Sequence, residues 1–158
     1  MRTSTRVEIR TLTPDEAAEL LRAHRVGRVA YSWRDHVDIV PIAYVYDGHA
    51  ILARTSEGAK LRTLRHSPWV AFEVDEVDGP YDWRSVVAHG TAHVLQPNGT
   101  AADRRAYDRA LELLRAREPA ALTDDDPVPS RAVVLQISVD RLSGRAATRG
   151  ATEASRAS

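Results

Sequence analysis

The alternation of apolar and polar residues predicts that most of this chain forms short β-strands. Each strand-like segment is bounded by turn-forming residues such as Gly, Pro, Asp and Asn. The predicted strands cover Val29–Trp33, Val37–Tyr46, Ala50–Arg54, Trp69–Val77, Trp83–Leu95 and Arg131–Asp140. The Asp47-Gly48 pair is typical of a tight hairpin turn. We therefore expect the first three strands to form an antiparallel meander.

Three segments show helical spacing instead. Thr13 and Glu16 can form a capping box for a first helix, which Gly27 is expected to end. A second, short helix is predicted over Ser56–Arg65, and Thr100 is suited to cap a third. The apolar stripe of the third helix comprises Ala106, Tyr107, Ala110, Leu111 and Leu114. Together these elements predict a mainly β protein, an antiparallel barrel with flanking helices, because barrel closure removes exposed strand edges.

The remaining segments set the expected limits of the domain. Asp75–Pro80 is acidic and is expected to form a solvated turn, and Gly90 is expected to kink or bulge its strand. Beyond Gly144 the sequence loses its periodicity and is rich in Arg, Ala, Thr and Ser. We expect an N-terminal segment at residues 1–10, one domain at residues 11–143 and a disordered tail at residues 144–158.

The composition excludes several classes of chemistry. The 158 residues include 22 Lys and Arg against 22 Asp and Glu, and this balance disfavours general nucleic-acid binding. The chain has no cysteine, so disulfides, thiolate catalysis and Cys-ligated metal centres are excluded. No segment has the roughly 18–20 apolar residues needed to span a membrane, and we therefore expect a cytoplasmic protein without membrane contact.

The segment Thr55–Arg62 carries the clearest candidate chemistry. It contains two hydroxyls, at Thr55 and Ser56, and Lys60, which is the only lysine of the chain. The segment joins a predicted strand to a predicted helix, whose N-terminus offers free N–H groups and the positive end of the helix dipole. The residues alone therefore indicate either an anion site for a group such as phosphate or a capped helix with a solvated lysine.

The six histidines are scattered over several predicted elements. They are His24, His36, His49, His66, His89 and His93. No His-Glu-x-x-His pattern is present, so structural or surface roles are expected rather than metal ligation. His66 and His89 are the histidines that we expect nearest to a ligand. Among the three tryptophans, Trp83 is the candidate for ligand contact, and the others are expected in the core or at a subunit interface.

Four sequence blocks, in this order, resemble the pyridoxamine 5′-phosphate oxidase-like flavoproteins. The blocks are Val40–Gly48, Thr55–Leu61, Val70–Asp75 and Trp83–Gly90. The similarity extends from Thr11 to Asp140, and the nearest branch resembles the small proteins that include nitroimidazole-resistance reductases. This resemblance implies a split β-barrel homodimer that binds flavin mononucleotide (FMN) in clefts between the two subunits.

The same resemblance implies which residues contact the cofactor. They are Val40, Pro41, Ile42, Thr55, Ser56, Lys60, Trp83 and Ser85. The first three belong to a strand whose backbone would lie beside the isoalloxazine ring, and the next three would hold the FMN phosphate. The last two would approach the flavin, with the partner subunit as one source. Arg84 between them departs from the shorter Trp-Ser-Val pattern of the branch.

The resemblance also implies an activity. We expect an FMN-dependent reductase or oxidase that acts on a small organic substrate by hydride or electron transfer, with NAD(P)H as the electron donor. One alternative is a protein that uses or binds the deazaflavin coenzyme F420, and another is a non-catalytic flavin-binding or sensing protein. Haem binding is disfavoured because no histidine is suitably placed, and vitamin B6 oxidation because the additional basic residues for its substrate phosphate are missing.

Overall fold

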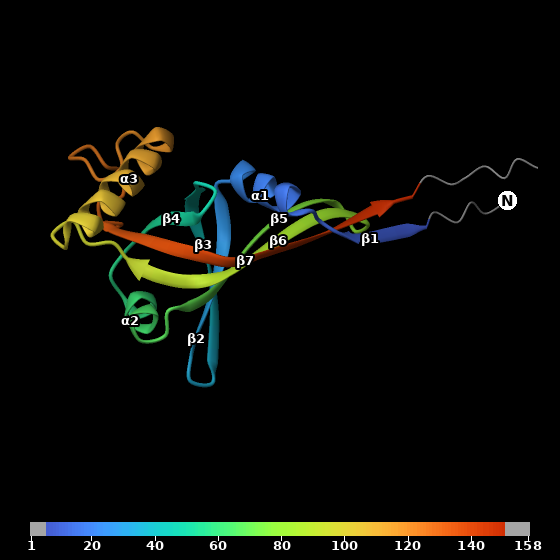
Figure 1. Cartoon of the computed structure of the whole chain (residues 1–158), viewed down its shortest axis with the longest axis horizontal. Coiled ribbons are helices and arrows are strands. Elements are labelled where there is room, and N and C mark those ends of the chain that lie inside the picture. Colours follow the sequence, from blue (N-terminus) through green and yellow to red (C-terminus); the bar gives the residue numbers. More distant parts are fainter. Residues whose placement is uncertain (1–5, 151–158) are drawn as a thin grey trace, which may run out of the picture.

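The computed structural model describes residues 6–150 and contains seven strands and three helices within them (Figure 1). The strands are β1 Val7–Thr11, β2 Val26–Trp33, β3 His36–Tyr46, β4 Ala50–Thr55, β5 Trp69–Gly79, β6 Asp82–Val94 and β7 Val133–Arg149. The helices are α1 Pro14–Ala23, α2 Ala59–His66 and α3 Ala101–Arg117. None of these helices is long and apolar enough to cross a membrane.

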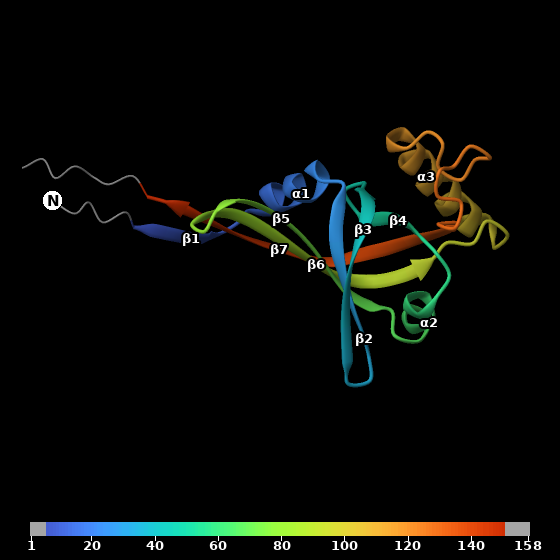
Figure 2. The same cartoon turned by 180° about the vertical axis from the view of Figure 1, so that it is seen from behind.

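The strands form one antiparallel sheet in the order β1-β7-β4-β3-β2-β5-β6. An additional pairing between β6 and β7 closes the sheet, so that six strands complete a barrel and β1 extends it along β7. The meander of β2, β3 and β4 is present as predicted. The expected split barrel with flanking helices is confirmed, and the β2–β3 hairpin projects away from its body in both views (Figures 1 and 2).

Strand β7 is longer than the sequence predicts. It continues to Arg149, so the expectation of a disordered tail from residue 144 is wrong up to that point, and residues 151–158 lie outside the described residues. The physical reason is pairing with both β6 and β1, which buries Ala146 and Ala147. Strand β1 is therefore part of the sheet rather than a separate N-terminal segment. Gly144 allows a close approach, because a Cβ there would lie 2.7 Å from Cδ1 of Leu12.

Two further local expectations, on the end of the first helix and on the acidic stretch Asp75–Pro80, are also wrong. Helix α1 has the predicted capping box at Thr13, but it ends at Ala23, and Gly27 lies within β2. Glycine is needed there because a Cβ would lie 2.3 Å from the Phe72 ring. The acidic stretch that was expected to form a solvated turn instead continues β5 to Gly79, because it pairs with β6 and its Glu76 accepts hydrogen bonds from Arg84.

The predicted turn and bulge are both confirmed. Gly48 has a φ of +98°, and the Asp47 carboxylate accepts hydrogen bonds from the N–H groups of His49 and Ala50 at 2.8 Å. The register of β6 against β7 shifts between His89 and Gly90. These features fix the tight β3–β4 connection and the bend of β6.

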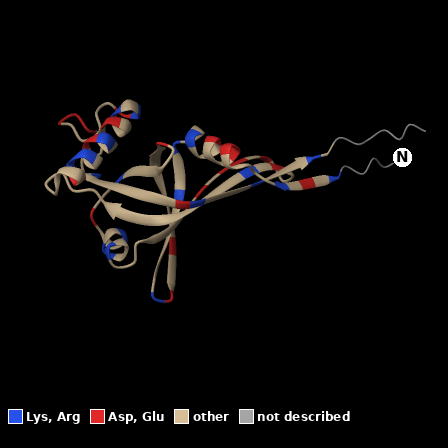
Figure 3. Cartoon of the chain, in the orientation of Figure 1, with Lys and Arg blue, Asp and Glu red and all other residues tan. Residues whose placement is uncertain are grey.

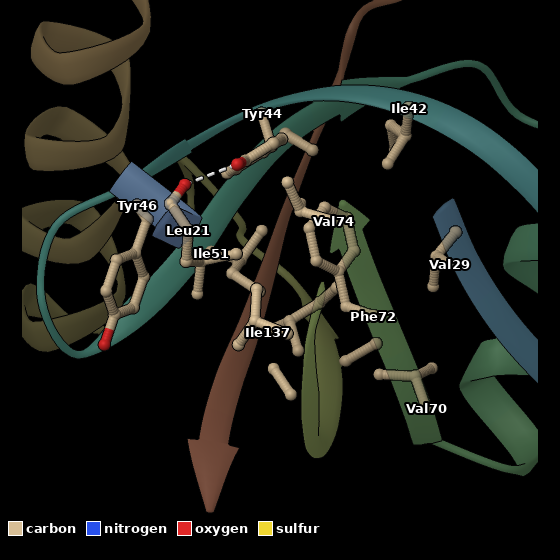
Figure 4. Packing of buried hydrophobic residues seen from close by; sticks show 14 of the residues in the cluster. Leu21, Val29, Ile42, Tyr44, Tyr46, Ile51, Val70, Phe72, Val74 and Ile137 are labelled. Atoms are coloured by element: carbon tan, nitrogen blue, oxygen red, sulfur yellow. Dashed lines mark hydrogen bonds between the residues drawn. The ribbon is translucent and has the colours of Figure 1, made fainter. Parts of the chain in front are cut away.

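The main core fills the barrel interior and contacts α1 and α2. Phe72 and Leu21 are fully buried in it, and the Tyr44 ring packs edge-on against the Phe72 ring (Figure 4). The Tyr44 hydroxyl donates a hydrogen bond to the carbonyl of Leu21 near the end of α1. A second apolar cluster lies between α3 and the outside of the sheet, with Ala110 and Leu114 facing Val45. Helix α3 has the predicted Thr100 cap, and both acidic and basic residues lie along it (Figure 3).

Candidate functional site

The connection between β4 and α2 forms an open helix N-terminus. Helix α2 begins at Ala59, three residues later than predicted, and no side chain caps it, whereas α1 and α3 both have capping boxes. The difference arises because Ser56–Gly58 form a loop, with Gly58 at the N-cap position. The first-turn N–H groups of α2 therefore have no intrahelical or side-chain acceptor and are available to a ligand.

A cavity of about 490 Å³ lies at this helix end. We call it the phosphate cavity. Its lining residues come from β2, β3, β4, α2 and the segment before β7, and they are Val26, Pro41, Ile42, Ala43, Arg54, Thr55, Ser56, Glu57, Gly58, Ala59, Lys60 and Arg131. Five of the eight sequence-predicted site residues are thus brought together around one space.

Lys60 gives the phosphate cavity an unneutralised positive charge. Its pKa is lowered from the ordinary lysine value, chiefly because the side chain is partly buried and also because Arg131 is nearby. Among the described residues no carboxylate lies within 4.0 Å of its ammonium, and the neighbouring Glu57 is instead paired with Arg65 at 3.1 Å. A bound anion would offset both effects, because it stabilises the charged form of the lysine.

Strand β3 presents a free backbone edge to the same cavity. Its pairing with β4 covers only Tyr44–Tyr46, whereas its pairing with β2 extends from His36 to Ala43. Within residues 6–150, the β3 edge that faces away from β2 therefore has no strand partner before Tyr44. Because such an edge carries N–H and C=O groups, it can bind a planar heterocycle along Pro41 and its neighbours.

The side chains of Val40 and Ile42 do not face this edge as ligand contacts. Ile42 is buried in the barrel core, and Val40 packs against that core and does not line the phosphate cavity. Alternate residues of a strand point to opposite faces, so Pro41 and Ala43 point outward. The Tyr44 N–H donates to the carbonyl of Arg25, so the backbone groups of the alternate residues Ile42 and Val40 also point toward β2. The free edge of β3 therefore carries the backbone groups of Pro41 and Ala43 rather than theirs.

Trp83 and Ser85 do not line the phosphate cavity of this chain. They lie on the outer face of β6, where Ser85 is opposite Asp75 of β5, and two strands separate them from β3. Strands lie about 4.8 Å apart, so three strand spacings correspond to roughly 14 Å. The structure therefore does not bring Trp83 and Ser85 together with Lys60 within one chain.

A charged cluster, which the sequence analysis missed, lies on β2 and β5, between the β3 edge of the phosphate cavity and Trp83 and Ser85 on β6. Arg28 is directly opposite both Pro41 and Glu73, and its guanidinium lies 3.5 Å from Glu73 and 3.7 Å from Asp75. Burial raises the pKa of Glu73 to about 7, and a hydrogen bond with Asp75 and its charge add to the effect. Strand alternation places all of these side chains on the outer face, but only strand register shows that they meet.

A second cavity, of about 270 Å³, adjoins the phosphate cavity. We call it the arginine cavity. It is lined by Arg25, Val26, Ala43, Tyr44, Val45, Arg54, Leu114, Arg117, Glu118 and Arg131. The sequence analysis missed this site, because its four arginines come from four distant segments and no local motif joins them.

The histidines and tryptophans are dispersed. Nε2 of His24 lies 2.7 Å from Oε1 of Glu76, His66 packs against Trp33, and His89 lines an open surface cavity with Trp69. Trp33 and Trp69 are exposed rather than part of the core. Within residues 6–150, no group of three or more His, Asp and Glu side chains could hold a metal ion.

Comparisons with known proteins agree with this architecture. A FAD-binding protein from Mesorhizobium loti has 28% sequence identity and a TM-score of 0.69, with 87% of this chain and 96% of that chain covered. An uncharacterised protein from Rhizobium meliloti (strain 1021) is 27% identical, with 90% of this chain and 97% of that protein covered. A candidate 5-nitroimidazole antibiotic resistance protein from Bacteroides thetaiotaomicron shares the fold at 15% identity, with a TM-score of 0.64 and coverage of 93% and 95%.

A comparison with protein families identifies the family of this chain. The sequence profile of the pyridoxamine 5′-phosphate oxidase family matches residues 13–146, which include β2 to β6, all three helices and most of β7. This chain therefore belongs to the pyridoxamine 5′-phosphate oxidase family, as the four sequence blocks and the split barrel indicate.

Proposed function

We propose that this protein binds a flavin nucleotide in the phosphate cavity and acts as a flavin-dependent oxidoreductase on a small organic molecule. The observation that carries the proposal is the position of an uncapped helix N-terminus and Lys60 beside the free edge of β3. FMN is the smallest flavin that would use both features. The FAD-binding relative from Mesorhizobium loti supports a flavin as the ligand.

The residues present fit a phosphate monoester. Thr55 and Ser56 supply hydroxyl donors, Lys60 supplies an ammonium, and the first turn of α2 supplies N–H groups. A phosphate carries about −1.5 to −2 charges near neutral pH, so these donors would offset much of its charge. With the phosphate held there, the outward backbone edge at Pro41 would orient the ring by hydrogen bonds rather than by side-chain contacts.

The bound flavin supplies the hydride or electron transfer chemistry of such an enzyme. The contribution of this chain is to bind and orient the cofactor. Backbone N–H groups along β3 would stabilise negative charge at the edge of the ring, and the Arg28–Glu73–Asp75 cluster lies on the same outer face. This division of labour requires no side-chain nucleophile in the site. NAD(P)H is the electron donor that we propose.

We also propose that the site is completed in a homodimer. The outer face of β2, β3 and β5 carries apolar side chains that a monomer leaves in water, with Val37 75%, Ile39 64% and Trp69 67% exposed. Such a patch is typical of an interface. Two copies joined through this face would let Trp83 and Ser85 of one copy approach the phosphate cavity of the other, which explains why they are remote within one chain.

Purification followed by absorption spectroscopy tests the proposal. We expect a yellow protein that releases flavin on heating and whose colour is bleached by NADH or NADPH in the absence of oxygen. Lys60→Ala should be purified with less flavin, whereas Arg62→Ala, an exposed change on the same helix, should not. A colourless protein that binds neither FMN nor FAD but binds F420 would contradict the flavin assignment. If the protein binds flavin but neither NADH nor NADPH reduces it, a role as a flavin carrier or sensor would be favoured instead.

A further inference from the structure

We propose that the arginine cavity binds a second phosphate and its attached nucleoside, which belong to the same cofactor whose first phosphate lies at Lys60. This inference rests on the proposed function and deepens it. The cofactor preferred by this chain would then be a flavin with an adenosine diphosphate portion, FAD, rather than FMN. Three properties of the arginine cavity support this inference: its position beside the phosphate cavity, its charge and its walls.

The two cavities adjoin along β2 and β3. Val26, Ala43, Arg54 and Arg131 line both of them. Along β3, Pro41 borders only the phosphate cavity and Val45 only the arginine cavity. The arginine cavity is therefore the next space along β3 from the phosphate cavity, on the Val45 side, and a group attached to a phosphate near Lys60 could extend into it.

The arginine cavity has an excess of positive charge. Glu118 is its one acidic lining residue, and Glu118 pairs with Arg54 at 3.2 Å. Arg54 is further neutralised by Asp126. Within the described residues, Arg25, Arg117 and Arg131 form no salt bridge, so three guanidinium charges around this space lack a carboxylate partner. Guanidinium groups bind phosphate oxygens through paired N–H donors, which makes a diphosphate a suitable ligand.

Arg117 is held in place without losing its charge. Its Nη1 donates to the carbonyl oxygens of His24 at 3.0 Å and Tyr44 at 3.2 Å, and its Nη2 donates to that of Arg22 at 3.2 Å. Carbonyl acceptors fix the guanidinium plane but supply no negative charge. A phosphate that enters the cavity would therefore meet a positioned cation.

The remaining walls of the arginine cavity are apolar. Val26, Val45 and Leu114 line it beside the arginines. A planar nucleobase can pack on such a surface while its diphosphate contacts the cations. This combination of apolar and cationic walls fits a nucleotide better than a simple inorganic anion, which would use only the charge.

Binding titrations of FAD and FMN with the apoprotein test this inference. We expect the wild-type protein to bind FAD at least about tenfold more tightly than FMN, the scale of one charge-assisted contact. Arg25→Gln should remove about that advantage and leave FMN affinity unchanged, because Arg25 lines only the arginine cavity. Lys60→Ala should weaken both flavins. Arg105→Gln, an exposed change on α3 that lines neither cavity, is the matched control and should alter neither affinity.

Four results would overturn the inference in distinguishable ways. Equal affinity for FMN and FAD would contradict the second phosphate site but leave the proposed flavin-binding function intact. Equal weakening of both flavins by Arg25→Gln would have the same consequence. Binding of neither flavin would contradict both the second phosphate site and the proposed function. NADH also contains adenosine diphosphate; if the FMN-loaded protein binds NADH and Arg25→Gln weakens only that binding, the cavity belongs to the electron donor rather than to FAD.

Discussion

Arg54 of β4 and Asp126 of the segment between α3 and β7 form an ion pair that is shielded from water. The side chain of Arg54 is 8% exposed and that of Asp126 is 2% exposed. The same guanidinium donates to the carbonyls of Arg131 and Val128, and the Asp126 carboxylate accepts from the N–H groups of Leu122 and Val128. The pair therefore fixes the loop before β7 against the strand that leads into the phosphate cavity.

We expect Asp126→Asn to destabilise the protein, because it leaves a shielded guanidinium without its charged partner. The melting temperature at neutral pH should fall by several degrees, measured by calorimetry. Hydrogen bonds from Leu122 and Val128 and the charge of Arg54 hold the pKa of Asp126 below its ordinary value. Its stabilising effect is present above the ordinary aspartate pKa and is lost as the pH falls through the lowered one. Asp124→Asn, an exposed change in the same loop, is the control; equal melting temperatures for the two variants would contradict the role of the pair.

Lys60→Ala should weaken flavin binding by about 1–3 kcal/mol, the scale of losing a charge-assisted hydrogen bond to phosphate. Because the pKa of Lys60 is lowered from its ordinary value, flavin affinity should fall at a lower alkaline pH than an ordinary lysine would give. The measurement is a fluorescence titration across that range. Arg62→Ala should keep the wild-type pH dependence, and an identical dependence in Lys60→Ala would remove Lys60 from the site.

The raised pKa of Glu73 predicts that stability decreases as the pH rises from about 4.5 to about 7. In that window the folded protein keeps a proton on Glu73 that the unfolded chain has already released, so raising the pH favours unfolding. Denaturant titrations of wild type and Glu73→Gln at several pH values check this expectation. The variant should lose this component of the pH dependence, whereas Glu112→Gln on the exposed side of α3 should retain it. An unchanged slope in Glu73→Gln would refute the assignment.

Ile39→Arg should dissociate the proposed homodimer, because it places a charge within the exposed apolar face of β2, β3 and β5. Size-exclusion chromatography with light scattering should show a monomer that also binds flavin more weakly, since the partner's contacts are lost. Ile9→Arg on β1 is the matched control, because Ile9 is similarly exposed at 61% but lies on a different strand. A wild-type protein that is monomeric at micromolar concentration would contradict the dimer.

The sequence by itself determined the elements that depend on local patterns. Alternating apolar residues identified six of the strands, and capping residues marked two helix starts at Thr13 and Thr100. The grouping of Thr55, Ser56 and Lys60 was also visible, because these residues are contiguous and their chemistry needs no distant partner. Glycine was harder to interpret: Asp47-Gly48 has a local turn signal, whereas Gly27 is required by the ring of Phe72, which is distant in sequence.

Tertiary structure alone decided the features that depend on contacts between distant segments. Pairing with β1 and β6 extends β7 to Arg149 through a stretch with little intrinsic periodicity. Strand register brings Arg28 next to Glu73 and separates Trp83 and Ser85 from Lys60. The arginine cavity likewise exists only because β2, β4, α3 and the segment before β7 converge. Local sequence specifies strand and helix propensity, but closure of the barrel decides which side chains share a site.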